Sequence, residues 1–217
     1  MRVKHVPTLA GTPVGLAVGV GDGDTLGAVA GAVDPGTVVD YVAEVQGAVP
    51  LVPGSEDDCC ARLVRRLGYE RRDVSRTWLT FLRGLDLAVE TDEGFRRTRT
   101  EPSLDGLRAG LLDGVVGARE IAERAVGGDT DDSAAAETAE RTAGGATTVE
   151  TVFDAVEPLI PRWERTRTDD WEEVWRGRVV RLCDWLAALG LLDADAGESS
   201  GEPTYVATAA THAALES

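Results

Sequence analysis

Residues 73–98 read DVSRTWLTFLRGLDLAVETDEGFRRT, and their apolar period changes half way along. In the first half the apolar side chains recur every three or four residues, which places them on the inner face of a helix: Val74, Trp78, Phe81, Leu82 and Leu85. Asp73 is suited to cap this helix. The period then falls to two, so that residues 87–90 and 95–99 predict strands joined by a turn at 91–94. The stretch therefore predicts a helix followed by a β-hairpin.

Two further helices are predicted before this stretch. From Pro35 onward, apolar residues recur at helical spacing until Pro50 and Pro53 end the pattern. A second helix follows Ser55, with an apolar stripe of Cys59, Cys60, Leu63, Val64 and Leu67, and Gly68 ends it. The predicted order is three helices and a hairpin.

This order resembles winged-helix DNA-binding domains, especially those of archaeal transcription regulators, over residues 36–101. The resemblance implies that the helix at 73–85 enters the major groove of double-stranded DNA and that the hairpin arginines approach phosphates or the minor groove. The residues that it implies as DNA contacts are Arg72, Ser75, Arg76, Thr80, Arg83, Arg96, Arg97 and Arg99.

The local charge supports this interpretation. Ten arginines and six acidic residues lie between Cys60 and Thr100, a local charge of +4 in a chain whose net charge is −16. Two alternatives stay open, because arginines among acids often form a solvated ion-pair face and winged helices also serve as protein-binding modules. At high salt a DNA-binding protein also gains less affinity from arginines, since counterion release fades as salt rises.

The composition resembles that of proteins from salt-loving archaea. The chain has 38 acidic and 22 basic residues, and Lys4 is its only lysine. In molar salt the Debye length is roughly 3 Å, so an acidic surface repels itself little and stays hydrated. An ordinary acidic bacterial protein is the alternative.

One helix is predicted over residues 102–126, with Gly106, Gly110 and Gly114 four residues apart on one face. Such a row indicates close approach of a second backbone, either the same helix of a dimer partner or the carboxy-terminal domain. A frayed or kinked helix is the alternative.

The predicted fold class is mainly α with short β-hairpins (α+β), in five segments. A glycine-rich, loosely ordered arm covers residues 1–34, and the winged-helix domain covers 35–101. The connecting or dimerisation helix at 102–126 and an acidic flexible linker at 127–146 lead to a second, degenerate winged-helix-like domain at 147–217.

In this last domain the sequence predicts a helix through Val156, a long helix from Asp169, and a hairpin of residues 191–194 and 204–208 across an acidic loop. Trp185–Leu189 matches Trp78–Leu82, which indicates a repeat without an obvious separate second helix. We do not extend DNA contact to this half, because its hairpin is acidic. Its four tryptophans are interpreted as a core, a protein interface or a ligand pocket: Trp163, Trp171, Trp175 and Trp185.

No cofactor, metal or catalytic residue is predicted. His5 and His212 lie near opposite ends of the sequence, and Cys59, Cys60 and Cys183 form no metal-binding spacing. No apolar stretch is long enough to span a membrane, so we expect a cytoplasmic protein. The sequence thus predicts a DNA-binding transcriptional regulator of a halophilic archaeon, with a second copy of the chain in a homodimer as one expected partner. A winged-helix adaptor that binds protein is the alternative, and an acidic enzyme is a third possibility.

Overall fold

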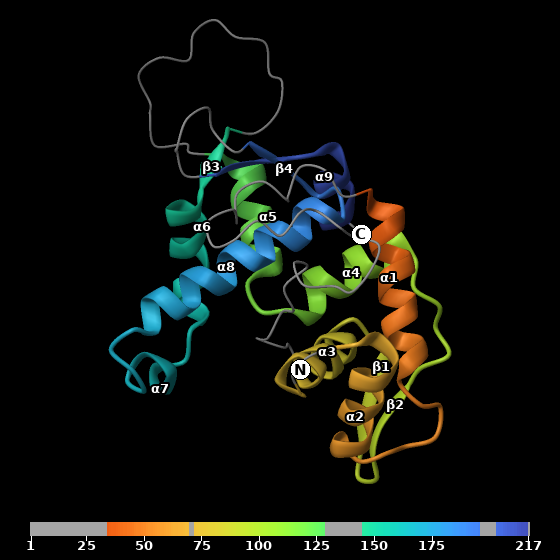
Figure 1. Cartoon of the computed structure of the whole chain (residues 1–217). Helices are drawn as coiled ribbons and strands as arrows, with labels where there is room; N and C mark the ends of the chain where they lie inside the picture. Colours follow the sequence, from red (N-terminus) through yellow and green to blue (C-terminus); the bar gives the residue numbers. More distant parts are fainter. Residues whose placement is uncertain (1–33, 70–71, 129–144, 196–202, 217) are drawn as a thin grey trace, which may run out of the picture. The chain divides into compact units, whose positions relative to one another are not determined.

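The computed structural model describes residues 34–69, 72–128, 145–195 and 203–216. The chain divides into two compact units, the first ending at Val116 and the second starting at Gly117. Figure 1 labels the helices and strands of both units. The predicted arm and nearly all of the predicted linker lie outside the described residues.

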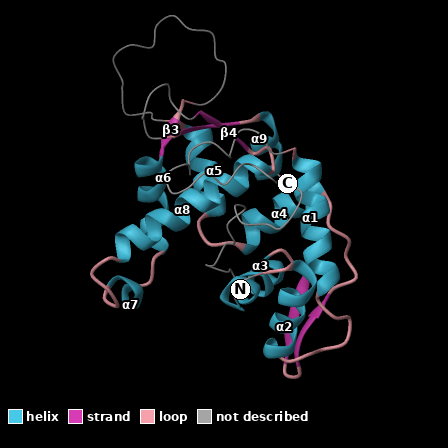
Figure 2. Cartoon of the chain, in the orientation of Figure 1, coloured by secondary structure: helices cyan, strands magenta, loops and turns pink. Residues whose placement is uncertain are grey.

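The first unit contains the predicted helices and hairpin. Its helices are α1 (Pro35–Ala48), α2 (Glu56–Leu67), α3 (Arg72–Gly84) and α4 (Leu104–Gly114), and its strands are β1 (Ala88–Thr91) and β2 (Gly94–Arg97). The Ser55 hydroxyl accepts the Asp58 amide at 3.1 Å, and Gly68 ends α2 with a φ of 70°. The predicted signals for the start and the end of α2 are therefore both confirmed. Figure 2 shows the hairpin as the magenta pair of this unit.

One residue of the loop between α1 and α2 pairs with the outer side of the hairpin. Strand β1 pairs antiparallel with β2, and Gly54 bridges Phe95 through two backbone hydrogen bonds of 2.8 and 3.0 Å. A Cβ at Gly94 would lie 2.0 Å from the Gly54 carbonyl oxygen, and its φ of 119° suits glycine. The close approach of this loop explains why the turn ends in glycine.

The core of the first unit forms around Trp78. This side chain packs edge to face against Tyr41 and Phe81, with ring centroids 5.5 and 5.8 Å apart. Buried Gln46 on α1 donates to the carbonyl oxygens of Leu87 at 3.1 Å and Thr100 at 2.8 Å. Both ends of the hairpin are thereby fastened to α1.

The single helix predicted over 102–126 is wrong. The structure has α4, then a break at Val115–Gly117, then α5 (Ala118–Gly127) in the second unit. Gly117 has a φ of 89°, which no residue inside a helix adopts. Apolar spacing continues across the break, and this continuity made one helix the natural prediction.

The glycines of α4 pack inside the first unit. A Cβ at Gly114 would lie 1.7 Å from the Gly84 carbonyl oxygen, and one at Gly110 would lie 3.0 Å from the Cα of Leu85. The close backbone approach that the glycine row predicted is confirmed, but the partner is the end of α3. It is neither a dimer partner nor the carboxy-terminal domain.

The second unit consists of five α-helices and three strands among its described residues. The helices are α5, α6 (Val149–Val156), α7 (Arg162–Arg165), α8 (Trp171–Ala188) and α9 (Ala209–Leu215), with a 3-10 turn at Glu157–Leu159. The strands β3 (Thr147–Thr148), β4 (Leu192–Asp195) and β5 (Thr204–Ala207) form a sheet in the order β3-β5-β4. The predicted hairpin is confirmed, whereas β3 was not predicted.

The two units repeat the same turn, after α3 in the first unit and after α8 in the second. In the first unit Asp86 has a φ of 57°, and the Leu87 amide donates to the Leu82 carbonyl at 2.9 Å. In the second unit Gly190 has a φ of 68°, and Leu191 donates to Leu186 at 2.8 Å. The repeat predicted from the sequence is therefore present in the backbone.

The register of that repeat needs two corrections. The shared turn pairs Asp86 with Gly190, so Trp185 corresponds to Phe81 and not to Trp78. Helix α6 was predicted, but it follows α5 in this unit and is therefore the separate second helix that the sequence analysis did not identify. The register error comes from matching tryptophans by type, and the helix count was short by one because α5 was predicted as part of a single helix with α4.

The tryptophans of the second unit differ in their surroundings. Trp175 and Trp185 are buried core residues, and Trp171 is half-buried beneath the Arg165 guanidinium at 5.3 Å. Trp163 is 57% exposed. The core interpretation therefore holds for two of the four.

Candidate nucleic-acid interface

The outer face of α3 is the candidate site of the first unit. The buried residues of this helix are Ser75, Trp78, Leu79, Phe81, Leu82 and Gly84. Val74 is 37% exposed, so its predicted inward position is wrong. The buried face of α3 is centred on Leu79 and Leu82. Val74, in the first turn, lies at the edge of this face and is exposed to solvent.

Ser75 is also corrected. It was predicted to contact DNA, but its side chain is fully buried and its hydroxyl has no hydrogen-bond partner among the described residues. Ser75 precedes Trp78 by three residues and Leu79 by four, which puts all three on one helix face. This spacing could have predicted that Ser75 is buried. The prediction of an exposed Ser75 rested on its polar side chain.

Two arginines on the outer face of α3 pair with carboxylates at the start of α2. Arg76 Nε donates to Glu56 Oε1 at 2.7 Å, and Arg72 forms an ion pair with Asp57. The hydrogen bond with Glu56 raises the pKa of Arg76. These acids lie in the first turn of α2, where they stabilise the helix dipole. Acidic residues at the start of a predicted helix are the sequence signal from which their position could have been predicted.

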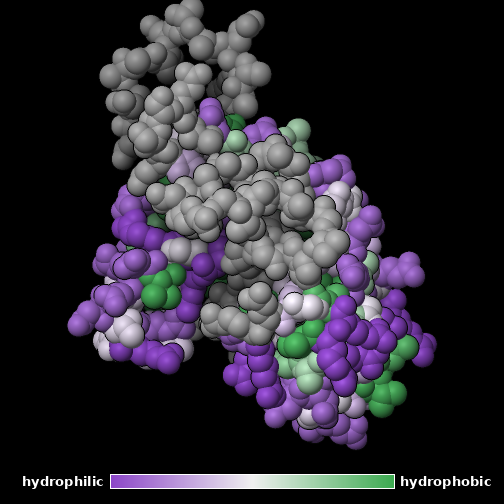
Figure 3. All heavy atoms as spheres, in the orientation of Figure 1, coloured by the Kyte–Doolittle hydropathy of each residue, from purple (hydrophilic) through white to green (hydrophobic). Residues whose placement is uncertain are grey.

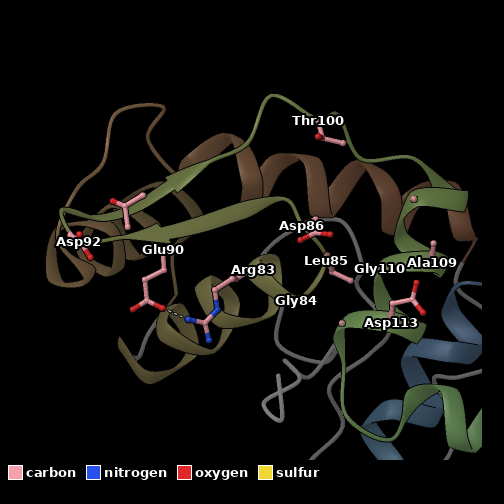
Figure 4. A pocket seen from close by; sticks show the side chains of 13 residues that line it. Arg83, Gly84, Leu85, Asp86, Glu90, Asp92, Thr100, Ala109, Gly110 and Asp113 are labelled. Carbon is pink, nitrogen blue, oxygen red and sulfur yellow. Dashed lines mark hydrogen bonds and ion pairs between the residues drawn. The ribbon is translucent and has the colours of Figure 1, made fainter. Parts of the chain in front are cut away.

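Arg83 pairs with Glu90 of the hairpin. Figure 4 shows the two side chains pointing toward each other at the edge of a hollow beside α3, β1 and α4. The hollow has a volume of about 810 Å³. Four carboxylates and Arg83 are its charged lining groups, the acids being Asp86, Glu90, Asp92 and Asp113. Its charge is therefore unfavourable for a phosphate.

The three hairpin arginines do not share one environment. Arg97 lies on the same strand face as buried Phe95, and its Nη1 donates to the Gly47 carbonyl oxygen at 3.1 Å. The predicted DNA contact of Arg97 is therefore corrected, because its side chain binds the end of α1. Arg96 is half-exposed, Arg99 is exposed, and neither pairs with another described residue.

The tip of the hairpin is acidic. Asp92 and Glu93 form the turn between β1 and β2, and both are exposed. A wing that enters the minor groove leads with its tip, so these two charges oppose that insertion. Of the predicted contacts, Arg72, Arg76, half-exposed Thr80 and Arg83 face outward on α3, and Arg96 and Arg99 are the outward hairpin residues.

Helix α8 corresponds to α3 in the second unit, and two of its three arginines, Arg176 and Arg178, are also paired. Arg176 binds Glu150 of α6 and stacks on Phe153. Arg178 Nη1 donates to Glu164 at 2.9 Å, and Trp175 Nε1 donates to the same carboxylate at 2.8 Å. The second unit thus uses Arg176 and Arg178 for internal contacts, which agrees with leaving DNA contact out of this half.

Each unit combines helices, a helix-to-strand turn and a β-hairpin in the same order, which defines a protein with two winged-helix copies. The model of the halobacterial double winged helix domain matches residues 31–204, so the chain belongs to this family. The comparisons with curated proteins and with solved structures gave no match.

None of the described helices is both long and apolar enough to cross a lipid bilayer. The histidine, cysteine and acidic side chains of the described residues form no group of three that is placed to hold a metal ion. The three cysteines are buried and unpaired, as expected for small core residues.

Proposed function

We propose that the first unit binds double-stranded DNA and that the protein acts as a transcriptional regulator. The observation that carries the proposal is the outward position of Arg72 and Arg76 on α3, with side chains 57% and 67% exposed. The family match supports it at the level of the fold, since a winged helix presents this helix to the major groove.

The ion pairs of these arginines are compatible with DNA binding. Exposed pairs contribute about 0 to 1 kcal/mol and weaken in salt, so a phosphate can replace a carboxylate at small cost. Asp57 is 76% exposed and Glu56 36% exposed, so neither acid is held in the core. Glu56 and Asp57 then act as internal competitors of the DNA backbone.

A protein-binding adaptor is the second candidate function. The acidic hairpin tip at Asp92 and Glu93 and the pairing of all three α3 arginines favour it. Under this alternative the ion pairs of α3 remain intact when the protein binds its partner, and no phosphate displaces the carboxylates.

The two candidates differ in what happens when the competing acids are removed. We would measure binding of a fluorescein-labelled duplex of mixed sequence by anisotropy between 0.1 and 0.5 M KCl, with circular dichroism to confirm folding. Glu56→Gln with Asp57→Asn is expected to tighten binding several-fold, because two competing charges are lost. Arg72→Ala with Arg76→Ala is expected to weaken binding and reduce the salt slope by about 2.

Two controls separate local from general effects. Asp40→Asn with Glu44→Gln makes the same charge change on the exposed side of α1 and is expected to have a smaller effect. Ser75→Ala is expected to leave binding unchanged, because the hydroxyl is buried. Equal affinity and equal salt slope in all variants would eliminate the regulator and favour the adaptor.

Three further parts belong to this proposal. A DNA-binding role places the protein in the cytoplasm and assigns it no catalytic step. A homodimer would bind two half-sites, but the glycines of α4 no longer argue for it, because they pack against α3. Light scattering of the chain with and without duplex measures that stoichiometry directly.

A further inference from the structure

Two arginines from distant segments meet at the carboxyl end of α1. Arg66 of α2 and Arg97 of β2 each donate to the Gly47 carbonyl oxygen, at 3.4 and 3.1 Å. Neither forms an ion pair with a carboxylate of the described residues. This differs from α3, where every predicted arginine contact has an acidic partner. One carbonyl dipole leaves two guanidiniums with unused donors and mostly uncompensated charge.

Two exposed apolar side chains lie in the loop that adjoins these arginines. Leu51 is 54% exposed and Val52 is 75% exposed. The Pro50 carbonyl accepts the Arg97 amide at 2.8 Å, and Gly54 is bridged to Phe95. The loop is thus fastened on both sides of Leu51 and Val52. Figure 3 shows apolar side chains among hydrophilic ones on the surface of this unit.

We propose that Leu51, Val52, Arg66 and Arg97, here called the α1-end surface, bind an acidic peptide segment of another protein that carries apolar side chains. Carboxylates of the peptide would accept from the two guanidiniums, and its apolar side chains would cover Leu51 and Val52. A DNA backbone has phosphates for the arginines but no apolar group for the exposed pair. The chemistry of the surface therefore favours a peptide.

The combination of charge and apolar area suits high salt. At 1 M salt the Debye length is roughly 3 Å, so the net charge of −16 repels an acidic peptide only weakly, while groups in direct contact still attract. Burial of apolar surface is not screened by salt. Binding at the α1-end surface is therefore expected to persist at molar KCl, where binding to phosphates fades.

The test uses a fluorescein-labelled synthetic peptide of alternating glutamate, aspartate, leucine and phenylalanine, with the full chain at 0.2 and 2 M KCl. A second peptide carries glutamine and asparagine in place of its acids. The wild-type chain is expected to bind the acidic peptide at both salt concentrations and the amide peptide at least fivefold more weakly. Leu51→Ser with Val52→Ser and, separately, Arg66→Glu are each expected to weaken acidic-peptide binding at least fivefold.

Arg65→Glu is the matched control, since it makes the same charge change one residue away on the exposed side of α2. It is expected to keep wild-type affinity within twofold. Arg72→Ala with Arg76→Ala is also expected to leave peptide binding unchanged, which separates this proposal from DNA binding by α3. Circular dichroism checks that each variant is folded.

Three results would overturn the proposal. The first is no binding of the acidic peptide by the wild-type chain. The second is equal weakening by Arg65→Glu and Arg66→Glu, or no effect of the Leu51 and Val52 replacements, which would reduce binding to general charge attraction. The third is full displacement of the peptide by duplex DNA at 2 M KCl, which would assign the surface to nucleic acid.

Discussion

Asp184 is a half-buried titratable residue of the second unit. It lies on α8 beside Cys183, and burial raises its pKa to about 6, against the weaker opposing effect of Arg181. The same burial lowers the pKa of Arg181. An acid that is harder to ionise in the folded chain than in the unfolded chain makes stability depend on pH.

The sign of this dependence follows from the raised pKa. The folded chain binds the Asp184 proton more tightly, so this group contributes stability below pH of about 4 and loses it as the pH rises through about 6. Asp184→Asn is expected to raise the free energy of unfolding at pH 8 by about 1 to 3 kcal/mol and to change it little at pH 4. Urea unfolding at both pH values measures this difference. A variant less stable at pH 8 than the wild type would contradict it.

The sequence predicted only in part which side chains of α3 and β2 face outward. Arg72, Arg76 and Arg83 were correctly placed on the outer face, because large apolar residues define the opposite stripe. Ser75 and Arg97 were misplaced, although helix spacing to Trp78 and strand alternation with Phe95 contained the correction. The acidic partners on α2 could not be paired from the sequence, because pairing depends on how the helices dock.

At the scale of elements, the contact between α4 and the end of α3 links the helix after the hairpin to the candidate DNA-binding helix. The Gly84 carbonyl lies where a side chain at Gly114 would begin. Two helices that approach this closely cannot slide without losing the contact. The position of α3 therefore depends on α4 as well as on its own apolar stripe.

One methyl group tests this contact. Gly114→Ala is expected to lower the free energy of unfolding of the first unit by about 2 to 3 kcal/mol, because the new Cβ overlaps a backbone oxygen. Gly47→Ala adds the same methyl group to α1, where its nearest neighbour is Arg97 Nη1 at 3.6 Å. That variant is expected to gain about 0.5 kcal/mol from helix propensity. Equal effects of the two changes in thermal unfolding would contradict the assignment.

Helices with strong end signals were the elements that the sequence predicted best. Ser55 and Gly68 mark the bounds of α2, and Pro35 marks the start of α1. The break at Gly117 was missed because apolar spacing runs through it, and β3 was missed because two residues carry no period. In the second unit the cap of α9 was also missed, since Thr208 and Thr211 form a capping box without an acidic residue.

At the scale of the molecule, a net charge of −16 predicts that stability depends on salt. Like charges repel in the compact state, and salt screens them. The melting temperature is expected to rise between 0.2 and 2 M KCl. Replacing exposed acids by amides is expected to raise it at 0.2 M and to flatten its dependence on salt, with Asp40, Glu44, Glu172 and Glu173 as the sites. A melting temperature that falls with salt in the wild type would contradict this account.

The shared turn of the two units has a consequence for how this family can diversify. The bonds that define it join main-chain atoms, from Leu87 to Leu82 in one copy and from Leu191 to Leu186 in the other. Hydrogen bonds between main-chain atoms do not depend on the identity of the exposed side chains. Each copy can therefore change its exposed side chains by point mutation while it keeps its backbone fold, so the two copies of one polypeptide can bind different partners.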